Sequence, residues 1–429
     1  MNTPAAARSS LGPIAVVGAL FFIFGFVTWL NGPLITYVKL AFDLDDINAF
    51  LVPMAFYLSY FFLALPASWI LKSTGMKRGM ALGLFIMAVG ALAFGQFATM
   101  RIYPGALVGL FVIGAGLSLL QTAANPYVSI LGPIDSAAQR IAVMGICNKL
   151  AGIIAPLVLG ALVLNGIGDF AGQVAQADPA TKQVLLEQFA AKIRTPYTIM
   201  AVLLALLAFW ALRSPLPEIK ASEVNAQSSS VDAKGITNFR HLWLGVLCLF
   251  LYVGVEVMAG DAIGTYGRGF DLPLDETKFF TAFTLAAMLI GYLAGLVAIP
   301  RFLSQERYLA VSAVLGIAFS FAALVTHGYV SVGFVAALGF ANAMMWPAIF
   351  PLAIRGLGRY TELGSAFLIM GIAGGAIVPQ LFAHLKDHYD FQIVFCALMV
   401  PSYLYILYYG MFGCRVGIRA NVVASPQTA

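Results

Sequence analysis

Two carboxylates, Glu256 and Asp261, lie in a stretch of otherwise mostly apolar residues that runs from Leu251 to Gly267 (LYVGVEVMAGDAIGTYG). The stretch belongs to an apolar run long enough to cross a bilayer. A charge at membrane depth is costly unless it faces a protein interior or a wet cavity. The other Asp and Glu residues fall in expected loops or at expected helix ends. Both carboxylates are therefore candidates to bind a coupling cation, either H⁺ or, together with carbonyl groups, Na⁺.

Glycines on both sides of these carboxylates predict a loosened helix. Gly254, Gly260 and Gly264 could let the backbone open and offer its polar groups to an ion or solute. On a regular helix, residues five positions apart point in directions about 140° apart, so an unbroken helix would not aim both carboxylates at one ion. An alternative for Asp261 is a hydrated position near the outer mouth, with no role in transport.

Lys149 is the basic residue that the expected spans place at mid-membrane. An unpaired ammonium is disfavoured there, which predicts a carboxylate partner, either Glu256 or Asp261. A switchable pair of this kind could link cation binding to movement of the protein. The alternative is a side chain that extends to the membrane surface, although Lys149 is far from either end of its span.

Amides and one indole are the candidates for binding a neutral polyol, namely Asn31, Gln121, Asn125, Asn148, Asn342 and Trp346. An amide both donates and accepts hydrogen bonds, which suits hydroxyl groups better than a fixed charge does. Gln121 and Asn125 are four residues apart, as are Asn342 and Trp346, so each pair is predicted to share a helix face. Because apolar sugar faces stack on aromatic rings, the second pair is a candidate sugar platform. The alternatives are interhelical hydrogen bonding for the amides and packing for Trp346.

Composition determines the class of protein that must position these residues. Of the 429 residues, 61% are hydrophobic and 10% are charged, against roughly 25% charged in an average globular protein. The mean hydropathy is +0.90, and the apolar runs are continuous rather than alternating, which excludes a β-barrel. The sequence predicts an all-α polytopic membrane protein with twelve spans at about 13–38, 47–71, 79–99, 103–131, 138–165, 195–212, 240–267, 277–300, 307–326, 329–354, 363–386 and 391–413.

The distribution of basic residues predicts the orientation of the chain. Of the 24 Lys and Arg residues, fifteen fall on the side of the termini, eight fall on the opposite side, and Lys149 lies within a span. This asymmetry predicts cytoplasmic termini and no nucleic-acid partner. The first apolar run is expected to be a retained helix rather than a signal peptide. The four cysteines have no metal-like spacing and are expected to be core residues without disulfides, and no metal centre is predicted apart from Na⁺ near Glu256 and Asp261.

An internal repeat divides the chain. TAANPYVSILGP is followed by GICNKLAGIIAPLVLGAL, and MMWPAIFPLAIRGLG is followed by LIMGIAGGAIVPQLFAHL, with similar separations from Pro126 to Pro156 and from Pro347 to Pro379. The predicted units are a six-helix half at 1–212, a polar cytoplasmic linker at 213–239 and a second half at 240–429. A short surface helix is expected near 178–192. Six helices plus six, joined by a central linker, predict the major facilitator fold with its substrate at midplane.

Three motifs carry a more specific resemblance. GLSLLQTAANPYVSILGP, WLNGPL and YVGVEV resemble the fucose/glucose–galactose branch of the major facilitator superfamily over essentially the whole chain. The resemblance implies a cation-coupled sugar symporter of a bacterial inner membrane. In the fucose–proton members an Asp of helix 1 and a Glu of helix 4 carry the proton, whereas the matching positions here are Gly32 and Gln121. Asn148 matches the helix 5 Asn of that group.

The finer pattern resembles the glucose/galactose members, for which H⁺ or Na⁺ coupling is implied, and AGD ending at Asp261 is similar to N-acetylglucosamine permeases. The leading hypothesis is an importer of a neutral hexose such as glucose or galactose, coupled to H⁺ or Na⁺, without a cofactor and active as a monomer. The alternatives are an N-acetylglucosamine, fucose or mannose permease, or an exporter of sugars or drugs. Phosphate-binding GxxxxGK[ST] and hydrolase motifs are absent from the sequence, so no enzyme activity is expected.

Overall fold

The structure is a computed structural model, and it describes residues 11–130, 137–214, 216, 235–299 and 301–417. Within these ranges the chain is helical and contains no β-strand. In the same ranges, twelve helical segments are long and apolar enough to cross a membrane. The prediction of an all-α polytopic membrane protein with twelve spans is therefore confirmed.

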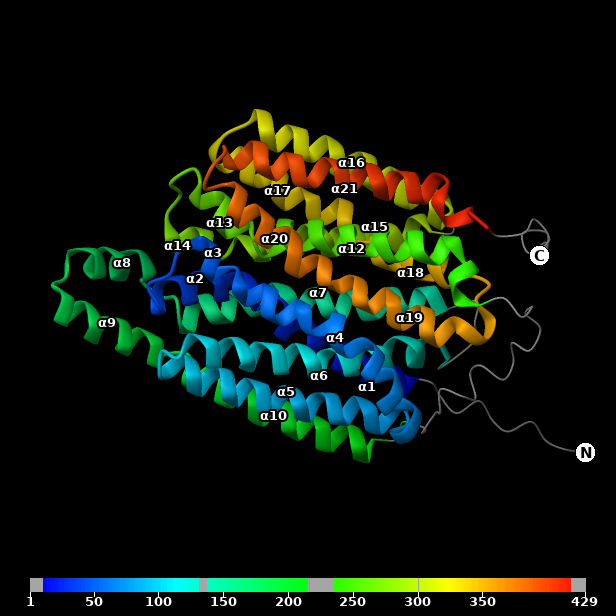
Figure 1. Cartoon of the computed structure of the whole chain (residues 1–429), viewed down its shortest axis with the longest axis horizontal. Coiled ribbons are helices and arrows are strands. Elements are labelled where there is room, and N and C mark those ends of the chain that lie inside the picture. Colours follow the sequence, from blue (N-terminus) through cyan, green and yellow to red (C-terminus); the bar gives the residue numbers. More distant parts are fainter. Residues whose placement is uncertain (1–10, 131–136, 215, 217–234, 300, 418–429) are drawn as a thin grey trace, which may run out of the picture.

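The helices form two bundles that lie side by side in Figure 1. The first bundle contains α1 (Leu11–Thr28), α2 (Asn31–Ala41), α3 (Asp46–Ala49), α4 (Leu51–Thr74), α5 (Met76–Thr99), α6 (Tyr103–Ile130), α7 (Ala137–Leu162) and α10 (Arg194–Arg213). The second contains α12 (Arg240–Gly260), α13 (Ile263–Arg268), α14 (Leu274–Thr277), α15 (Phe280–Ala298), α16 (Gln305–Val325), α17 (Gly328–Asn342), α18 (Met345–Ile354), α19 (Thr361–Met370), α20 (Gly374–Leu385) and α21 (Phe391–Met411). Short 3₁₀ turns complete the described chain at η2 (Ile236–Asn238), η3 (Gly358–Tyr360), η4 (Gly371–Ala373) and η5 (Gly413–Arg415).

The bundles meet along two seams. Helix α7 packs against α15 at one seam, and α4 packs against α19, η4 and α20 at the other. The start of α1 and the end of α21 lie at the same end of the molecule (Figure 1). We call this end the termini face and the other end the far face.

The far face carries two surface helices, α8 (Ile167–Gln176) and α9 (Pro179–Ala191). The second was predicted near 178–192, and it begins where the Asp178 carboxylate accepts hydrogen bonds from the backbone N–H groups of Ala180 and Thr181. The first was not predicted. Most of the predicted linker at 213–239 lies outside the described residues, so the domain boundaries 1–212, 213–239 and 240–429 stay a prediction.

Prolines interrupt the helix within two of the predicted spans. Pro33 has no N–H to donate to the carbonyl of Trp29, and α1 ends just before Trp29. Likewise, Pro347 has no N–H to donate to the carbonyl of Ala343, and α17 ends just before Ala343. The spans predicted at 13–38 and 329–354 are thus present, at Ala15–Ala41 and Gly328–Ile354, but each is divided into two helices.

The spans predicted at 240–267 and 363–386 are also interrupted, the second of them at η4. Helix α12 ends at Gly260, one of the glycines at which loosening was expected. Two hydroxyls stabilise this break, because Thr281 donates to the carbonyl of Gly260 at 2.8 Å and Thr284 donates to the carbonyl of Ala259 at 2.7 Å. Broken helices of this kind supply polar groups at the midplane of transporters.

The four cysteines are free thiols, and three of them are buried in the helical core. This agrees with their prediction as small core residues.

Candidate functional site

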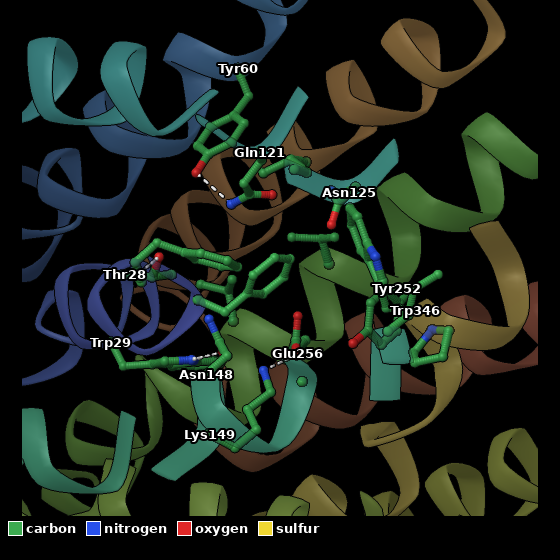
Figure 2. Close-up of a pocket in the computed structure, with 18 of the residues that line it drawn as sticks. Thr28, Trp29, Tyr60, Gln121, Asn125, Asn148, Lys149, Tyr252, Glu256 and Trp346 are labelled. Atoms are coloured by element: carbon green, nitrogen blue, oxygen red, sulfur yellow. Dashed lines mark hydrogen bonds and ion pairs between the residues drawn. The ribbon is translucent and has the colours of Figure 1, made fainter. Parts of the chain in front are cut away.

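A cavity lies between the bundles, between the helix breaks and the termini face. Its walls come from α1, α4, α6 and α7 of the first bundle and from α12, α15, α18 and η4 of the second. It contains about 790 Å³ of empty space, including solvent at its mouth. Figure 2 shows polar side chains from both bundles gathered around the cavity.

An ion pair crosses the cavity wall from one bundle to the other. Lys149 Nζ of α7 lies 3.0 Å from Glu256 Oε1 of α12, and the side chains are only 7% and 13% exposed (Figure 2). Lys149 Nζ also lies 4.5 Å from the ring centroid of Trp29, a distance at which the ring face attracts a cation. The predicted pairing of Lys149 with a carboxylate is confirmed, and of the two candidates its partner is Glu256.

Amides line the cavity from α6 and α7. Gln121 Nε2 donates to the Tyr60 hydroxyl at 3.0 Å, and Trp29 Nε1 donates to Asn148 Oδ1 at 3.3 Å. These bonds hold the two amides while leaving the oxygen of Gln121 and the nitrogen of Asn148 for a solute. Asn125 also lines the cavity. As predicted, Gln121 and Asn125 share one face of α6.

Trp346 lines the cavity, but Asn342 does not. The helix breaks between them, since α17 ends at Asn342 and α18 begins at Met345. Asn342 is fully buried, and its Oδ1 accepts a hydrogen bond from the Tyr403 hydroxyl at 2.8 Å. The prediction that Asn342 and Trp346 form one platform is therefore wrong, because it assumed a regular helix across Ala343.

Asp261 and Asn31 lie behind the cavity wall. They are 2% and 1% exposed. Tyr57, which lines the cavity, donates a hydrogen bond from its hydroxyl to Asp261 Oδ2 at 3.2 Å. Among the described residues, Asp261 Oδ1 and Asn31 Nδ2 have no hydrogen-bond partner. The structure thus separates Asp261 from the ion pair and places Asn31 away from the predicted polyol contacts.

Aromatic residues supply much of the cavity wall and were not predicted, namely Phe21, Phe24, Trp29, Tyr57, Tyr60, Tyr252 and Tyr292. Tyr57 and Tyr60 are three residues apart, a spacing that puts both on one face of α4. That spacing was a usable signal. In a chain with 13% aromatic residues, however, the same spacing also occurs on faces that pack against helices or lipid.

Polar contacts between the bundles close the far face. Asp46 of α3 binds Lys386, which follows α20, at 2.5 Å, and it also pairs with Lys39. Gln380 Nε2 donates to the carbonyl of Ile47 at 3.1 Å. Burial alone would lower the pKa of Lys386, but the hydrogen bond and charge of Asp46 outweigh it and raise that pKa above its ordinary value. The far-face bond therefore joins two charged groups at neutral pH.

A second set of contacts joins the bundles at the other edge of the far face. Asp275 Oδ2 accepts a hydrogen bond from the backbone N–H of Gly168 at 2.9 Å, and Lys278 Nζ donates to the carbonyl of Leu164 at 2.8 Å. The structure is thus closed at the far face and has its cavity toward the termini face.

Comparisons with known proteins agree with this architecture. The sequence profile of the Major Facilitator Superfamily matches residues 17–379. A glucose/galactose transporter of Brucella abortus is 34% identical over 400 residues, which cover 92% of each chain. The L-fucose–proton symporter of Escherichia coli is 30% identical over 390 residues, covering 89% of this chain and 88% of that protein.

Solved structures show the same fold. The crystal structure of the transporter FucP in the outward conformation matches with a TM-score of 0.73 and 27% identity, covering 95% of this chain and 99% of that chain. The fold and the profile define a secondary transporter, with twelve membrane-spanning segments in the part of the chain that the structure describes. The chain belongs to the major facilitator superfamily, in its fucose/glucose–galactose branch, and it is a multi-pass membrane transporter rather than an enzyme.

Proposed function

We propose that the protein imports a neutral hexose across a bacterial inner membrane together with a cation, by alternating access. The observation that carries this proposal is the cancellation of charge in the cavity. The charges of Lys149 and Glu256 offset each other at 3.0 Å, and the other polar groups around them are amides, hydroxyls and indoles. Such a lining favours a neutral solute with several hydroxyl groups over an anion or a cation.

The sugar is proposed from the cavity and from the names of the relatives. Gln121, Asn125 and Asn148 offer amide groups, and Trp29 and Trp346 offer ring surfaces for the apolar faces of a hexose. Two of the relatives described above carry glucose or galactose and L-fucose by their names. Glucose and galactose are therefore the first candidates, with fucose, mannose and N-acetylglucosamine as the alternatives.

The proposed coupling group consists of Glu256, Asp261 and Lys149. The ion pair joins the bundles at the cavity, and Asp261 lies where α12 breaks between the same bundles. A cation and a sugar that stabilise the same closed state have coupled binding free energies, and this coupling drives uphill uptake. The charge asymmetry of the sequence supports cytoplasmic termini, and a monomer is proposed because each chain contains both six-helix units.

Counterflow of labelled glucose into proteoliposomes tests the sugar assignment without any ion gradient. Unlabelled galactose, fucose, mannose and N-acetylglucosamine are added as competitors. The substitutions Gln121→Ala and Asn148→Ala are expected to weaken competition by the preferred hexose about tenfold each, since each removes hydrogen bonds worth roughly 0.5–1.5 kcal/mol or more. Asn342→Ala is the matched control, and its sugar affinity is expected to stay unchanged. An absence of exchange with all five sugars would refute hexose transport.

A further inference from the structure

We propose that Asp261 carries the coupling proton, and that proton binding there permits the far face to close. The proposal rests on the symport function given above. It specifies the coupling ion as H⁺ rather than Na⁺ and separates the proton site from the ion pair of Lys149 and Glu256.

Asp261 lies at the seam between the bundles. It follows α12 of the second bundle, but its carboxylate meets Tyr57 of α4 and lies beside Gly32 of α2, both in the first bundle. A Cβ atom added at Gly32 would lie 3.3 Å from Asp261 Oδ1 and 2.4 Å from Thr281 Oγ1. The backbone of α2 therefore packs directly against the carboxylate, and Asp261 can be enclosed in this way only when the far face is closed.

The enclosed carboxylate lacks a counter-charge. The ionisable groups that act on it from the neighbouring helices are Tyr57, Glu256 and Lys149, and the ammonium of Lys149 is already paired with Glu256. The first turn of α2 favours negative charge, but by less than the cost of burying an uncompensated carboxylate. A proton removes this charge, and Oδ1, which has no hydrogen-bond partner among the described residues, is free to carry it.

Na⁺ is a poor occupant of the same place. Sodium sites at broken helices use the carbonyl groups that the break exposes. Here Thr281 donates to the carbonyl of Gly260, Thr284 donates to that of Ala259, and the Asp261 N–H donates to that of Val257 at 2.7 Å. Each of these carbonyl oxygens therefore already gives one of its two lone pairs to a hydrogen bond, which leaves less of it for Na⁺.

Tyr57 connects the proton site to the cavity, because it lines the cavity and its hydroxyl donates to Asp261 Oδ2. With the far face open, the carboxylate takes one proton from the outer water and becomes a neutral carboxylic acid. Closure then buries it. The acid later releases the same proton past Tyr57 to water in the cavity and becomes a carboxylate again. The ionised carboxylate disfavours the closed far face, which returns the carrier to its outward-open form.

The distance across the far face tests this proposal independently of any sugar. Spin labels at Val184→Cys and Tyr389→Cys, both at exposed positions, report the separation of the bundles by pulsed electron paramagnetic resonance. The chain without introduced cysteines gives the labelling background, since Cys147 is only partly buried. The longer distance is expected to gain population at least tenfold between pH 5 and pH 9. In Asp261→Asn the short distance is expected to predominate at every pH.

Asp271→Asn is the matched control, because Asp271 is exposed and its positive φ of 58° suits Asn. It is expected to keep the pH response of the parent chain. Retention of that response by Asp261→Asn, or a parent chain that does not respond to pH, would overturn the proposal.

Proton movement in the unsubstituted protein provides a second measurement that does not depend on how a variant folds. Glucose is added to proteoliposomes that contain a pH-sensitive dye in Na⁺-free buffer. Entry of the sugar is expected to acidify the lumen. Sugar entry that requires Na⁺ and moves no protons would overturn the proton assignment while leaving sugar symport intact. If sugar exchange itself fails, hexose transport is refuted, and the distance measurement still decides the role of Asp261.

Discussion

Among the predictions, breaking the ion pair of Lys149 and Glu256 is expected to cause the largest change in the free energy of unfolding. At 3.0 Å and an effective dielectric constant near 20, the Coulomb attraction is about 5.5 kcal/mol before desolvation is counted. Removing one partner of a buried pair commonly costs about 3–5 kcal/mol, because the other charge is left uncompensated. Glu256→Gln and Lys149→Met are each expected to lower the free energy of unfolding by this amount. The double variant is expected to recover most of the loss.

Unfolding in mixed detergent micelles, followed by circular dichroism, measures this double-mutant cycle. The predicted coupling energy is about 3 kcal/mol or more. The pair of Lys182 and Asp43 is the matched control, because its atoms are 2.7 Å apart but its side chains are 35% and 58% exposed, and such pairs contribute roughly 0–1 kcal/mol. Additivity of the Glu256 and Lys149 variants within about 0.5 kcal/mol would refute the account of the pair. Glu256→Gln is also expected to abolish accumulation of sugar while leaving some exchange.

Three further predictions concern the cavity and the far face. Trp346→Ala is expected to weaken hexose affinity about three- to tenfold, because it removes a stacking surface worth roughly 0.5–1.5 kcal/mol. Competition in the counterflow assay measures this affinity, and an unchanged value would show that Trp346 does not contact the sugar. Lys386→Gln removes the ion pair with Asp46 and is expected to raise the population with an open far face about fivefold, equivalent to about 1 kcal/mol. The spin-label distance measures this population, and an unchanged distance distribution would show that the ion pair does not hold the far face closed. Gly32→Ala places a Cβ atom 2.4 Å from Thr281 Oγ1 and is expected to keep the far face open. Adding Thr281→Ala is expected to restore closure. Normal sugar uptake by the Gly32→Ala variant would contradict the close packing of α2 against Asp261 and Thr281.

Much of the fold was predictable because long apolar runs must be helical in a bilayer. The number of spans follows from the length of the apolar runs, and the arrangement of the spans in two bundles follows from the internal repeat. The surface helix α9 was also predicted. The helix breaks within the spans were harder to predict from the sequence. Pro33 and Pro347 mark two of them in the sequence, but a proline such as Pro66 lies inside α4 without ending it. Whether a proline bends or breaks a helix depends on what else satisfies the freed carbonyl groups.

The candidate site was predictable in chemistry but only partly in geometry. The cost of buried charge pointed to Glu256, Asp261 and Lys149, and the structure pairs two of them. That cost could not indicate which carboxylate Lys149 would choose, since the choice depends on how two helices from different bundles align. Asn342 was misplaced because four-residue spacing predicts a shared face only on an unbroken helix. The role of Tyr57 followed only from the structure, in which it reaches both the cavity and Asp261.

Accumulation of labelled hexose in proteoliposomes tests the central claim most directly. One set of vesicles has an imposed pH gradient without Na⁺, and a second set has an imposed Na⁺ gradient at equal pH. The account predicts uphill uptake in the first set, none in the second, and loss of uphill uptake but not of exchange in Asp261→Asn. Uphill uptake driven by the Na⁺ gradient alone, or by the pH gradient in Asp261→Asn, would contradict it.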